Sequence, residues 1–506
     1  MKKLLLTVGA IFIATALNAQ FSVWDGSAEP WTKGSGTQND PYLIENAQQL
    51  AYLAVKTNEL HYDNYSYHNM YVDTCFLLTV DLDLGGDNGL VWEPIAQDGN
   101  SLQTRCFGGN FDGNGHIVTN LQFEDGNGRR YMGLFGHVVG GSIKNITVEG
   151  DGMVVPEFNL SGIPAGLGMI VGYGENTIVA NCVNTLDVTW EYLMLEMGAG
   201  IGGLFGIMSN STITNCHNFG DIYAPETNTY YAGVCFGGIG GTLHNCEVAY
   251  CSNRNYANIT PKSGNDNFGQ VSCGGIAGRM SGTINYCFNI GDFNVVFDLE
   301  NAVGVKAAGG IMGGCTVEGS LSVSNSYSVT DISVSGNGES SYLGGILGYA
   351  DETMTVDVKN CYYLDNIDDN GYGIPKADED MRTQEFVDLL NAGETVFLMD
   401  TNGYLNNGYP VLDWYFEHFN SVDENSLGNT TYIYPNPVKD IFIIHFAKEA
   451  DCQLIEIHSL DGRLVETFPE TSPETLIDIS NLTPGIYILK VKTTDGKEYT
   501  ERIVKE

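Results

Sequence analysis

Aspartates are the residues in this sequence whose type and spacing could support chemistry. Asp81, Asp83 and Asp87 place three carboxylates on one turn, and Ca²⁺ prefers oxygen ligands of this kind. The spacing differs from that of an EF-hand loop. We treat these three aspartates as candidate calcium ligands and expect no other cofactor.

Paired carboxylates could also cleave glycans by general acid and base catalysis. Candidates are Asp81 with Asp83, Asp87, and the pair Asp368 and Asp369. The chain has 62 acidic residues, so turns and solvated surfaces account for such pairs equally well. Between residues 150 and 365 the cations that could assist an anionic substrate are Arg254, Lys262, Arg279, Lys306 and Lys359. A glycan-active enzyme is therefore the alternative interpretation, with no catalytic residue assigned.

Signatures of other enzyme classes do not occur in the sequence. There is no HExxH zinc-peptidase motif, no G-x-S-x-G nucleophile elbow and no G-x-x-x-x-G-K-[ST] phosphate loop. A tyrosine cluster at 62, 65, 67 and 71 could contact sugars or proteins, although such rings often pack in a core instead.

The elements that must position these residues repeat along the chain. Each repeat has a Gly-Gly-aliphatic-x-Gly segment, or a variant of it, and a second short β segment without helical periodicity. The aliphatic residue recurs every 34 to 37 residues, at Leu134, Ile170, Leu204, Ile239, Ile276, Ile311 and Ile346. A fixed period of this length indicates stacked repeats. We predict an all-β protein with a right-handed parallel β-helix, whose extended surface favours binding over catalysis.

Cysteines recur at one position of the repeat. Five of the twelve follow an Asn closely: Cys182, Cys216, Cys246, Cys287 and Cys361. Equivalent residues stack in a solenoid, so we predict an inward ladder of thiols beside a ladder of Asn side chains. Cys246 and Cys251 are close enough in sequence to be weighed as a disulfide. The absence of a CxxC pair argues against metal binding by cysteine.

Composition divides the chain into segments. Residues 1–20 read as a signal peptide, with Lys2 and Lys3 before a short apolar run. Residues 21–130 would form an N-terminal cap and the first coils, 131–365 the solenoid, and 366–420 a second cap with one helix over 378–391. Residues 421–431 are a polar linker, and 432–506 predict a small β-sandwich.

The net charge of −39 argues against nucleic acid and anionic membranes as partners. No apolar run after residue 20 approaches the length of a membrane span.

The repeat resembles the GLUG motif, which is named for its Gly-Leu-x-Gly core. The segments 133–136 and 203–206 match it directly, and 275–278, 310–313 and 345–348 match with Ile. Such repeats occur in bacterial surface proteins, including adhesin-like proteins and non-catalytic parts of some IgA-specific metallopeptidases. The resemblance covers roughly residues 30–415. It implies the solenoid architecture and says little about activity.

The last 75 residues resemble the type A sorting domain of the type IX secretion system. Tyr434, Pro435, Asn436 and Pro437 match its opening motif, and the end of the chain, including Lys505, matches its last block. The resemblance implies passage through the periplasm and then the outer membrane. It also implies removal of the domain by the sortase and attachment to surface lipopolysaccharide or release.

Together these features predict a secreted, adhesin-like protein that presents a solenoid face to a host protein or glycan. The alternatives are the glycan-active enzyme and a passive surface stalk.

Overall fold

The computed structural model describes residues 21–413 and 431–505 apart from short gaps. The gaps are 60–67, 98–104, 124–129, 151, 156–157, 161–163, 196–197, 230–232, 264–270, 298–304, 316–318, 337–340, 369, 401–405, 435–437, 439–440, 447–451, 460–462, 472–473, 483–484 and 494–497. The predicted signal peptide and most of the predicted linker therefore lie outside the described residues.

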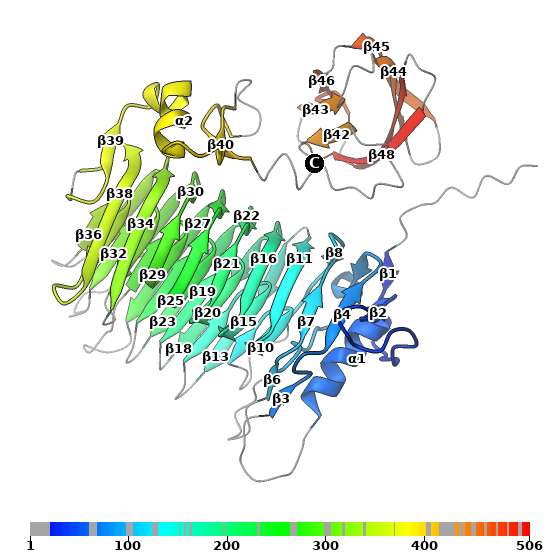
Figure 1. The fold of residues 1–506 in the computed structure, drawn as a ribbon, viewed down its shortest axis with the longest axis horizontal. Helices are drawn as coiled ribbons and strands as arrows, with labels where there is room; N and C mark the ends of the chain where they lie inside the picture. The colour runs from blue at the N-terminus through cyan, green and yellow to red at the C-terminus, as the bar shows by residue number, and fades with distance from the viewer. Residues whose placement is uncertain are drawn as a thin grey trace, which may run out of the picture.

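Parallel sheets run along a solenoid of about seven turns (Figure 1). Over the described residues the smallest of its three sheets takes one strand from each turn: β9 (Tyr131–Met132), β14 (Ala165–Leu167), β19 (Ala199–Gly202), β24 (Val234–Gly237), β28 (Val271–Gly274), β32 (Lys306–Gly309) and β36 (Ser341–Gly344). The predicted parallel β-solenoid is confirmed.

Within the described residues, a second parallel sheet takes one or two strands from each of six coils. In the described part of the chain it has eight strands: β12 (Met153–Val155), β13 (Phe158–Leu160), β17 (Val188–Trp190), β18 (Leu193–Leu195), β23 (Ile222–Thr229), β27 (Ala257–Ser263), β31 (Phe293–Phe297) and β35 (Ile332–Gly336).

The third and largest sheet spans the whole solenoid. Its 24 strands among the described residues are β1 (Ser22–Val23), β2 (Tyr42–Ile44), β3 (His68–Met70), β4 (Cys75–Leu78), β5 (Leu82–Asp83), β6 (Arg105–Phe107), β7 (Asn110–Asp112), β8 (Ile117–Thr119), β10 (Phe135–Val139), β11 (Ser142–Glu149), β15 (Val171–Glu175), β16 (Ile178–Asn184), β20 (Phe205–Ser209), β21 (Thr212–Thr214), β22 (His217–Asn218), β25 (Gly240–Ala249), β26 (Ser252–Asn253), β29 (Ala277–Asn285), β30 (Phe288–Asn289), β33 (Met312–Cys315), β34 (Ser320–Ser328), β37 (Leu347–Ala350), β38 (Thr355–Leu364) and β39 (Ile374–Lys376).

The repeated glycines are required where the chain bends from the seven-stranded sheet into the largest sheet. A Cβ atom on Gly203 would lie 2.3 Å from Cγ of Asn218, and one on Gly206 would lie 2.2 Å from the backbone nitrogen of Leu167. Leu204, between these glycines, is buried in the core. The same close approaches recur at Gly238, Gly241, Gly275 and Gly278. The repeat motif is therefore the sequence of a tight bend.

Two ladders at one corner bear out the predicted stacking of Asn and Cys. The Nδ2 of Asn181 donates to Oδ1 of Asn145 at 2.7 Å, and Nδ2 of Asn215 donates to Oδ1 of Asn181 at 3.2 Å. All of these Asn residues have positive φ, which Asn tolerates better than most residues. Tyr250 and Tyr286 take the place of Asn in the next two coils and stack with ring centroids 5.7 Å apart.

The predicted thiol ladder is right except at Cys246. Cys251, rather than Cys246, stacks with Cys216 and Cys287, and its backbone N–H points to Sγ of Cys287 at 3.4 Å. Cys246 lies at another corner, opposite Gly282 in the next coil. Cys246 and Cys251 are both free thiols. The error arose because this coil has two cysteines that follow a residue of positive φ: Cys246 follows Asn245, and Cys251 follows Tyr250. Only the first of these pairs contains the Asn that the pattern required.

A third ladder lies inside the solenoid and was not predicted. Nδ2 of Asn184 donates to Oδ1 of Asn218 at 2.9 Å, and the same bond joins Asn218 to Asn253 at 3.0 Å and Asn253 to Asn289 at 2.8 Å. These side chains are fully buried. Because each amide satisfies its neighbour, the desolvation cost of a buried polar group is offset.

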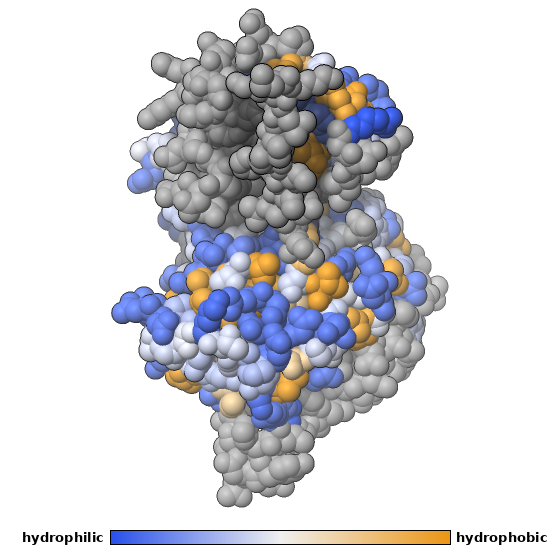
Figure 2. All heavy atoms as spheres, turned by 90° about the vertical axis from the view of Figure 1, so that its right-hand side faces the viewer, coloured by the Kyte–Doolittle hydropathy of each residue, from blue (hydrophilic) through white to orange (hydrophobic). Residues whose placement is uncertain are grey.

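Helix α1 (Ala47–Asn58) covers the N-terminal end of the solenoid, as predicted for a short N-terminal helix. The Asn46 side chain caps it by accepting from the backbone N–H of Gln49. Leu50 and Leu53 are buried in the main core. Figure 2 looks onto this end, where hydrophilic side chains surround scattered hydrophobic ones.

The C-terminal part of the solenoid is finished by a strap rather than by an end cap alone. Residues 365–376 run to β39, which pairs with β38. Residues 377–400 and 406–413, here called the strap, lie along the side of the last coils, as α2 and β40 (Phe397–Leu398) show in Figure 1. β40 pairs with β41 (Val411–Leu412) in an antiparallel hairpin.

The helix predicted over 378–391 is shorter than expected. A 3₁₀ turn, η2 (Asp380–Arg382), precedes α2 (Gln384–Asn391). Thr383 separates them because its backbone is extended, with φ of −121°, and its side chain accepts from the N–H of Phe386. Thr383 acts as an N-cap, a preference that outweighed the continuous apolar pattern.

The C-terminal segment forms two antiparallel sheets around one core. One contains β42 (Thr431–Tyr434), β43 (Ile441–Phe446) and β46 (Glu474–Asp478). The other contains β44 (Cys452–Ser459), β45 (Leu464–Thr471), β47 (Gly485–Thr493) and β48 (Glu498–Lys505). Phe442, Ile455 and Ile503 are buried between them. The predicted small β-sandwich is confirmed.

Candidate functional site

The outer surface of the eight-stranded sheet is the candidate site, here called the open face. Its outward residues stack in register from coil to coil: Thr189, Tyr223, Asn258, Asn294 and Ser333. A second column runs beside it at the corner: Asp187, Asp221, Tyr256, Asp292 and Asp331. The neighbours in sequence on β23, Ile222 and Ala224, are buried, so alternation along the strand turns Tyr223 outward.

Two tyrosines on adjacent coils are held by one carboxylate. Tyr223 donates its hydroxyl hydrogen to Oδ2 of Asp221 at 3.0 Å, and the backbone N–H of Tyr256 donates to Oδ1 of Asp221 at 2.6 Å. The two rings lie 6.1 Å apart and are tilted by 53°. The Tyr256 side chain is 37% exposed. Burial and the Asp221 carboxylate raise the pKa of Tyr223 to about 12, so its hydroxyl stays protonated at neutral pH.

Amide groups continue the face beyond these rings. Asn258 follows Tyr223 in the same column, and Nδ2 of Asn294 donates to Oδ1 of Asn258 at 3.2 Å. Both side chains are half-buried. An amide has more donor and acceptor sites than this bond uses. The column therefore offers hydrogen-bonding groups at the spacing of parallel strands, about 4.8 Å.

The two columns of the open face carry negative charge, whereas Lys262 lies further along β27 of the same sheet. None of the ten positions in the two columns is Lys or Arg. Burial, followed by the nearby Asp331, raises the pKa of Asp292. Arg254, two residues before Tyr256, lies over the ring of Phe219 at 5.7 Å. The face therefore presents carboxylates, amides and tyrosine rings.

An aromatic column on another flank, in the last coils of the solenoid, is closed by the strap. Phe288, Tyr327 and Tyr362 stack in register on β30, β34 and β38, and Tyr327 lies 5.3 Å from Phe288 with nearly parallel rings. Phe386 and Phe397 of the strap contact Tyr327 edge-on. This set is called the covered flank. Both of its tyrosines, Tyr327 and Tyr362, are buried, and they cannot meet a ligand unless the strap leaves.

The candidate calcium ligands lie at a corner near the N-terminal end, and two of them, Asp81 and Asp83, already accept hydrogen bonds. Asp81 accepts from the backbone N–H of Ile117 at 3.0 Å, and Asp83 accepts from the N–H of Gly85 at 2.8 Å. Asp87 is exposed in the 3₁₀ turn η1 (Gly86–Asn88). Among the described residues, no three His, Cys, Asp or Glu side chains are grouped as a metal ion would need. Calcium binding here stays a prediction.

The other predicted site residues are placed only in part. Asp368 is exposed, whereas Asp369 lies outside the described residues. Tyr434 ends β42, and residues 435–437 of the sorting motif lie outside the described residues, as do Tyr62, Tyr65 and Tyr67 of the tyrosine cluster. Lys505 is buried at the end of β48, which bridges to Val438. Tyr71 packs its ring 5.3 Å from that of Phe76.

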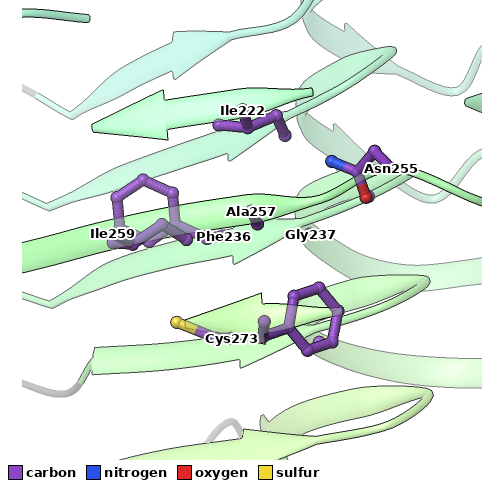
Figure 3. Close-up of a pocket in the computed structure, with 10 residues that line it drawn as sticks. Ile222, Phe236, Gly237, Asn255, Ala257, Ile259 and Cys273 are labelled. Carbon is purple, nitrogen blue, oxygen red and sulfur yellow. The ribbon is translucent and has the colours of Figure 1, made fainter. Parts of the chain in front are cut away.

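A narrow gap inside the solenoid has no room for a water molecule (Figure 3). Ile222, Phe236, Ala257 and Cys273 contribute to its apolar lining, and Asn255 is polar. Neither side-chain atom Nδ2 nor Oδ1 of Asn255 has a hydrogen-bond partner among the described residues. Burial raises the pKa of the Cys273 thiol. This gap belongs to the core and is not a binding site.

No helix in the described part of the chain is long and apolar enough to cross a membrane.

The C-terminal segment matches a known family. Residues 432–506 match the model of the secretion system C-terminal sorting domain. The protein is therefore a cargo of type IX secretion, exported to the cell surface or the extracellular space.

Similarity to curated proteins is confined to part of the chain. A "Putative Gly-rich membrane protein" of Evansella cellulosilytica is 33% identical over 172 residues, which are 33% of this chain and 17% of that protein. "Halomucin" of Haloquadratum walsbyi is 29% identical over 150 residues, 26% of this chain and 2% of that protein. The chain thus spans a small part of the length of the relatives it matches.

A solved structure is similar over more of the chain. It is a "putative immunoglobulin A1 protease" from Bacteroides ovatus, with 21% identity and a TM-score of 0.41, covering 76% of this chain and 95% of that one.

Sequence reasoning missed the Tyr223–Tyr256 pair. The two residues are 33 positions apart, and their proximity depends on the register of adjacent coils. The signal that could have found them is the repeat period, because Asp221 and Tyr256 are one period apart and Tyr223 is two residues from Asp221.

Proposed function

We propose that this protein is a secreted binding protein of the adhesin type, which presents an extended solenoid face to a host protein or glycan. The observation that carries the proposal is the open face, where two tyrosine rings and a row of amides lie partly exposed on strands held in register by the core. Rigid aromatic anchors with polar neighbours are typical of recognition surfaces.

Export supports this role, since a cargo of type IX secretion reaches the surface where host molecules are met. The repeats would then be GLUG-type repeats that build a display platform. In the same proposal, Tyr434 to Pro437 and Lys505 are read by the secretion machinery and its sortase, and the exported chain is attached to surface lipopolysaccharide or released. Mass analysis of the mature chain from cells and medium would test this, and an intact C-terminus at residue 506 would contradict it.

The binding role is tested by probing an array of glycans and host-matrix proteins with the secreted chain, with and without Ca²⁺. Saturable binding of an intact ligand is the expected result. Shortening of a bound polysaccharide would overturn the proposal in favour of a glycan-active enzyme. No binding to any glycan or protein on the array would favour a passive stalk. Binding that requires Ca²⁺ and is lost in Asp83→Asn would assign the calcium site to Asp81, Asp83 and Asp87.

A further inference from the structure

We infer that the open face binds an uncharged polysaccharide, with Tyr223 and Tyr256 as the platform on which sugar rings stack. The inference rests on the proposed binding function and deepens it by naming the ligand class. It is carried by three features of the face: the arrangement of its rings, the groups beside them, and its charge.

The rings are positioned before any ligand arrives. Asp221 accepts from the Tyr223 hydroxyl at 3.0 Å, which holds that ring, and from the backbone N–H of Tyr256 at 2.6 Å, which holds the backbone that carries the second ring. Ile222 and Ala257, which flank the rings in sequence, are buried in the core. A platform ordered in advance loses little conformational entropy on binding. Two rings on adjacent coils, with centroids 6.1 Å apart, suit a ligand that repeats along one direction.

The groups beside the rings match hydroxyl groups. Asn258 lies one coil beyond Tyr223 and Asn294 one coil further, joined by a single side-chain hydrogen bond. Their remaining donors and acceptors, and the carboxylate of Asp292, can bond to sugar hydroxyls, which both donate and accept. A polysaccharide lying along the solenoid axis would meet one such group in each coil.

The charge of the two columns argues against negatively charged glycans as ligands at these positions. Asp221, Asp292 and Asp331 lie in the corner column, and neither column of the face holds a cation. An anionic polysaccharide would meet like charges on a chain whose net charge is −39. An uncharged chain of sugars meets no such repulsion, and its binding should depend little on salt.

The test uses the full secreted chain and measures binding to soluble laminarin, mannan and dextran by calorimetry, with heparin and polylysine as charged comparators. We expect one or more of the neutral polymers to bind at both low and high salt. Tyr256→Ala should weaken that binding about tenfold or more, since one stacked ring contributes on the order of 1.4 kcal/mol.

Tyr342→Ala is the matched control, because Tyr342 is 43% exposed and lies on β36, away from the open face. It should leave the affinity unchanged. Tyr223→Phe keeps the ring and should weaken binding less than Tyr223→Ala. Thermal unfolding of each variant separates loss of the site from loss of the fold.

Each other outcome overturns the inference in a distinguishable way. Binding to heparin or polylysine alone, lost at high salt, would show a charge-driven surface. Equal loss in Tyr342→Ala would place the ligand elsewhere. Binding to a host protein but to no polysaccharide would end this inference and leave the proposed binding function standing. Binding to neither would end both.

Discussion

The covered flank and the open face belong to one solenoid and share some of its coils, yet they use their outward aromatic residues in opposite ways. On the covered flank Tyr327 is fully buried under the strap and stacks on Phe288. On the open face Tyr256 keeps 37% of its surface exposed. A solenoid aligns outward residues into columns on every side. What each column does depends on whether another part of the chain covers it, so aromatic content alone does not mark a binding surface.

The largest effect should come from removing an aromatic ring on the covered flank. Tyr327→Ala should destabilise the solenoid by about 3–5 kcal/mol, because a buried ring leaves a cavity. Tyr256→Ala should change stability by no more than about 0.5 kcal/mol, as exposed substitutions usually do. Urea unfolding monitored by circular dichroism measures both. Equal losses would mean that the open face is part of the core and would contradict the comparison.

Burial should also govern how the protonation of a side chain affects stability at different pH values. His137 packs between the rings of Tyr131 and Tyr173 and is 1% exposed. Burial lowers its pKa to about 4, so the unfolded chain binds the proton more tightly. The stability it contributes is fully present above pH 6.5 and is lost as pH falls to 4, a change of about 3 kcal/mol.

His137→Phe provides the check on this pH dependence, since the new ring cannot be protonated. Between pH 6.5 and 4 the free energy of unfolding of the variant should fall less than that of the parent protein, by the amount that His137 contributes. Unfolding at a series of pH values measures this difference. An unchanged profile would show that other groups cause the acid sensitivity.

Asn255 in the core and Asn258 on the open face, three residues apart, allow a comparison of the same side chain inside and outside the solenoid. Asn255→Leu should stabilise the solenoid by about 1–2 kcal/mol, because the buried amide has no partner among the described residues and its apolar replacement removes a desolvation cost. Leu186 occupies the corner equivalent to Asn255 two coils earlier, so the side chain has a precedent. Asn258→Leu, on the open face, should have little effect. A loss of stability in Asn255→Leu, seen as a lower Tm, would mean that the gap cannot accept the larger side chain.

The smallest effect concerns the open face itself. Asp221→Asn removes the charge that, after burial, raises the pKa of Tyr223. The pKa of Tyr223 should fall from about 12 toward the ordinary value while the fold is kept. Nuclear magnetic resonance of ¹³C-labelled tyrosine follows the titration, with Tyr342 as the reference. An unmoved pKa would show that Asp221 does not hold the hydroxyl.

Some features of the fold could be predicted because they follow from local sequence. The repeat period and the glycines of the bend indicated the solenoid, since only glycine fits where Gly206 meets the backbone of the preceding coil. The apolar segment from Ile441 to Phe446 indicated a strand of the sandwich, and the strand has those bounds. The Asn and Cys ladders followed from the same period, except at Cys246.

Other features required the tertiary structure. The sequence could not show that Asn245 and Tyr250 occupy different corners, because a one-corner shift depends on the register with Gly282 in the next coil. It could not show that the strap lies along a flank, since its apolar stripe would fit an end of the solenoid equally well.

The sequence by itself determined the repeated coil, the C-terminal sandwich and the negative charge, because each depends on residues close in the chain or on composition. Only the tertiary structure decided which columns are covered, which tyrosines become neighbours and which carboxylate holds them. The physical reason is that stacking joins residues a whole period apart. Their contacts depend on register and on the path of the strap, and neither is encoded in any short stretch of sequence.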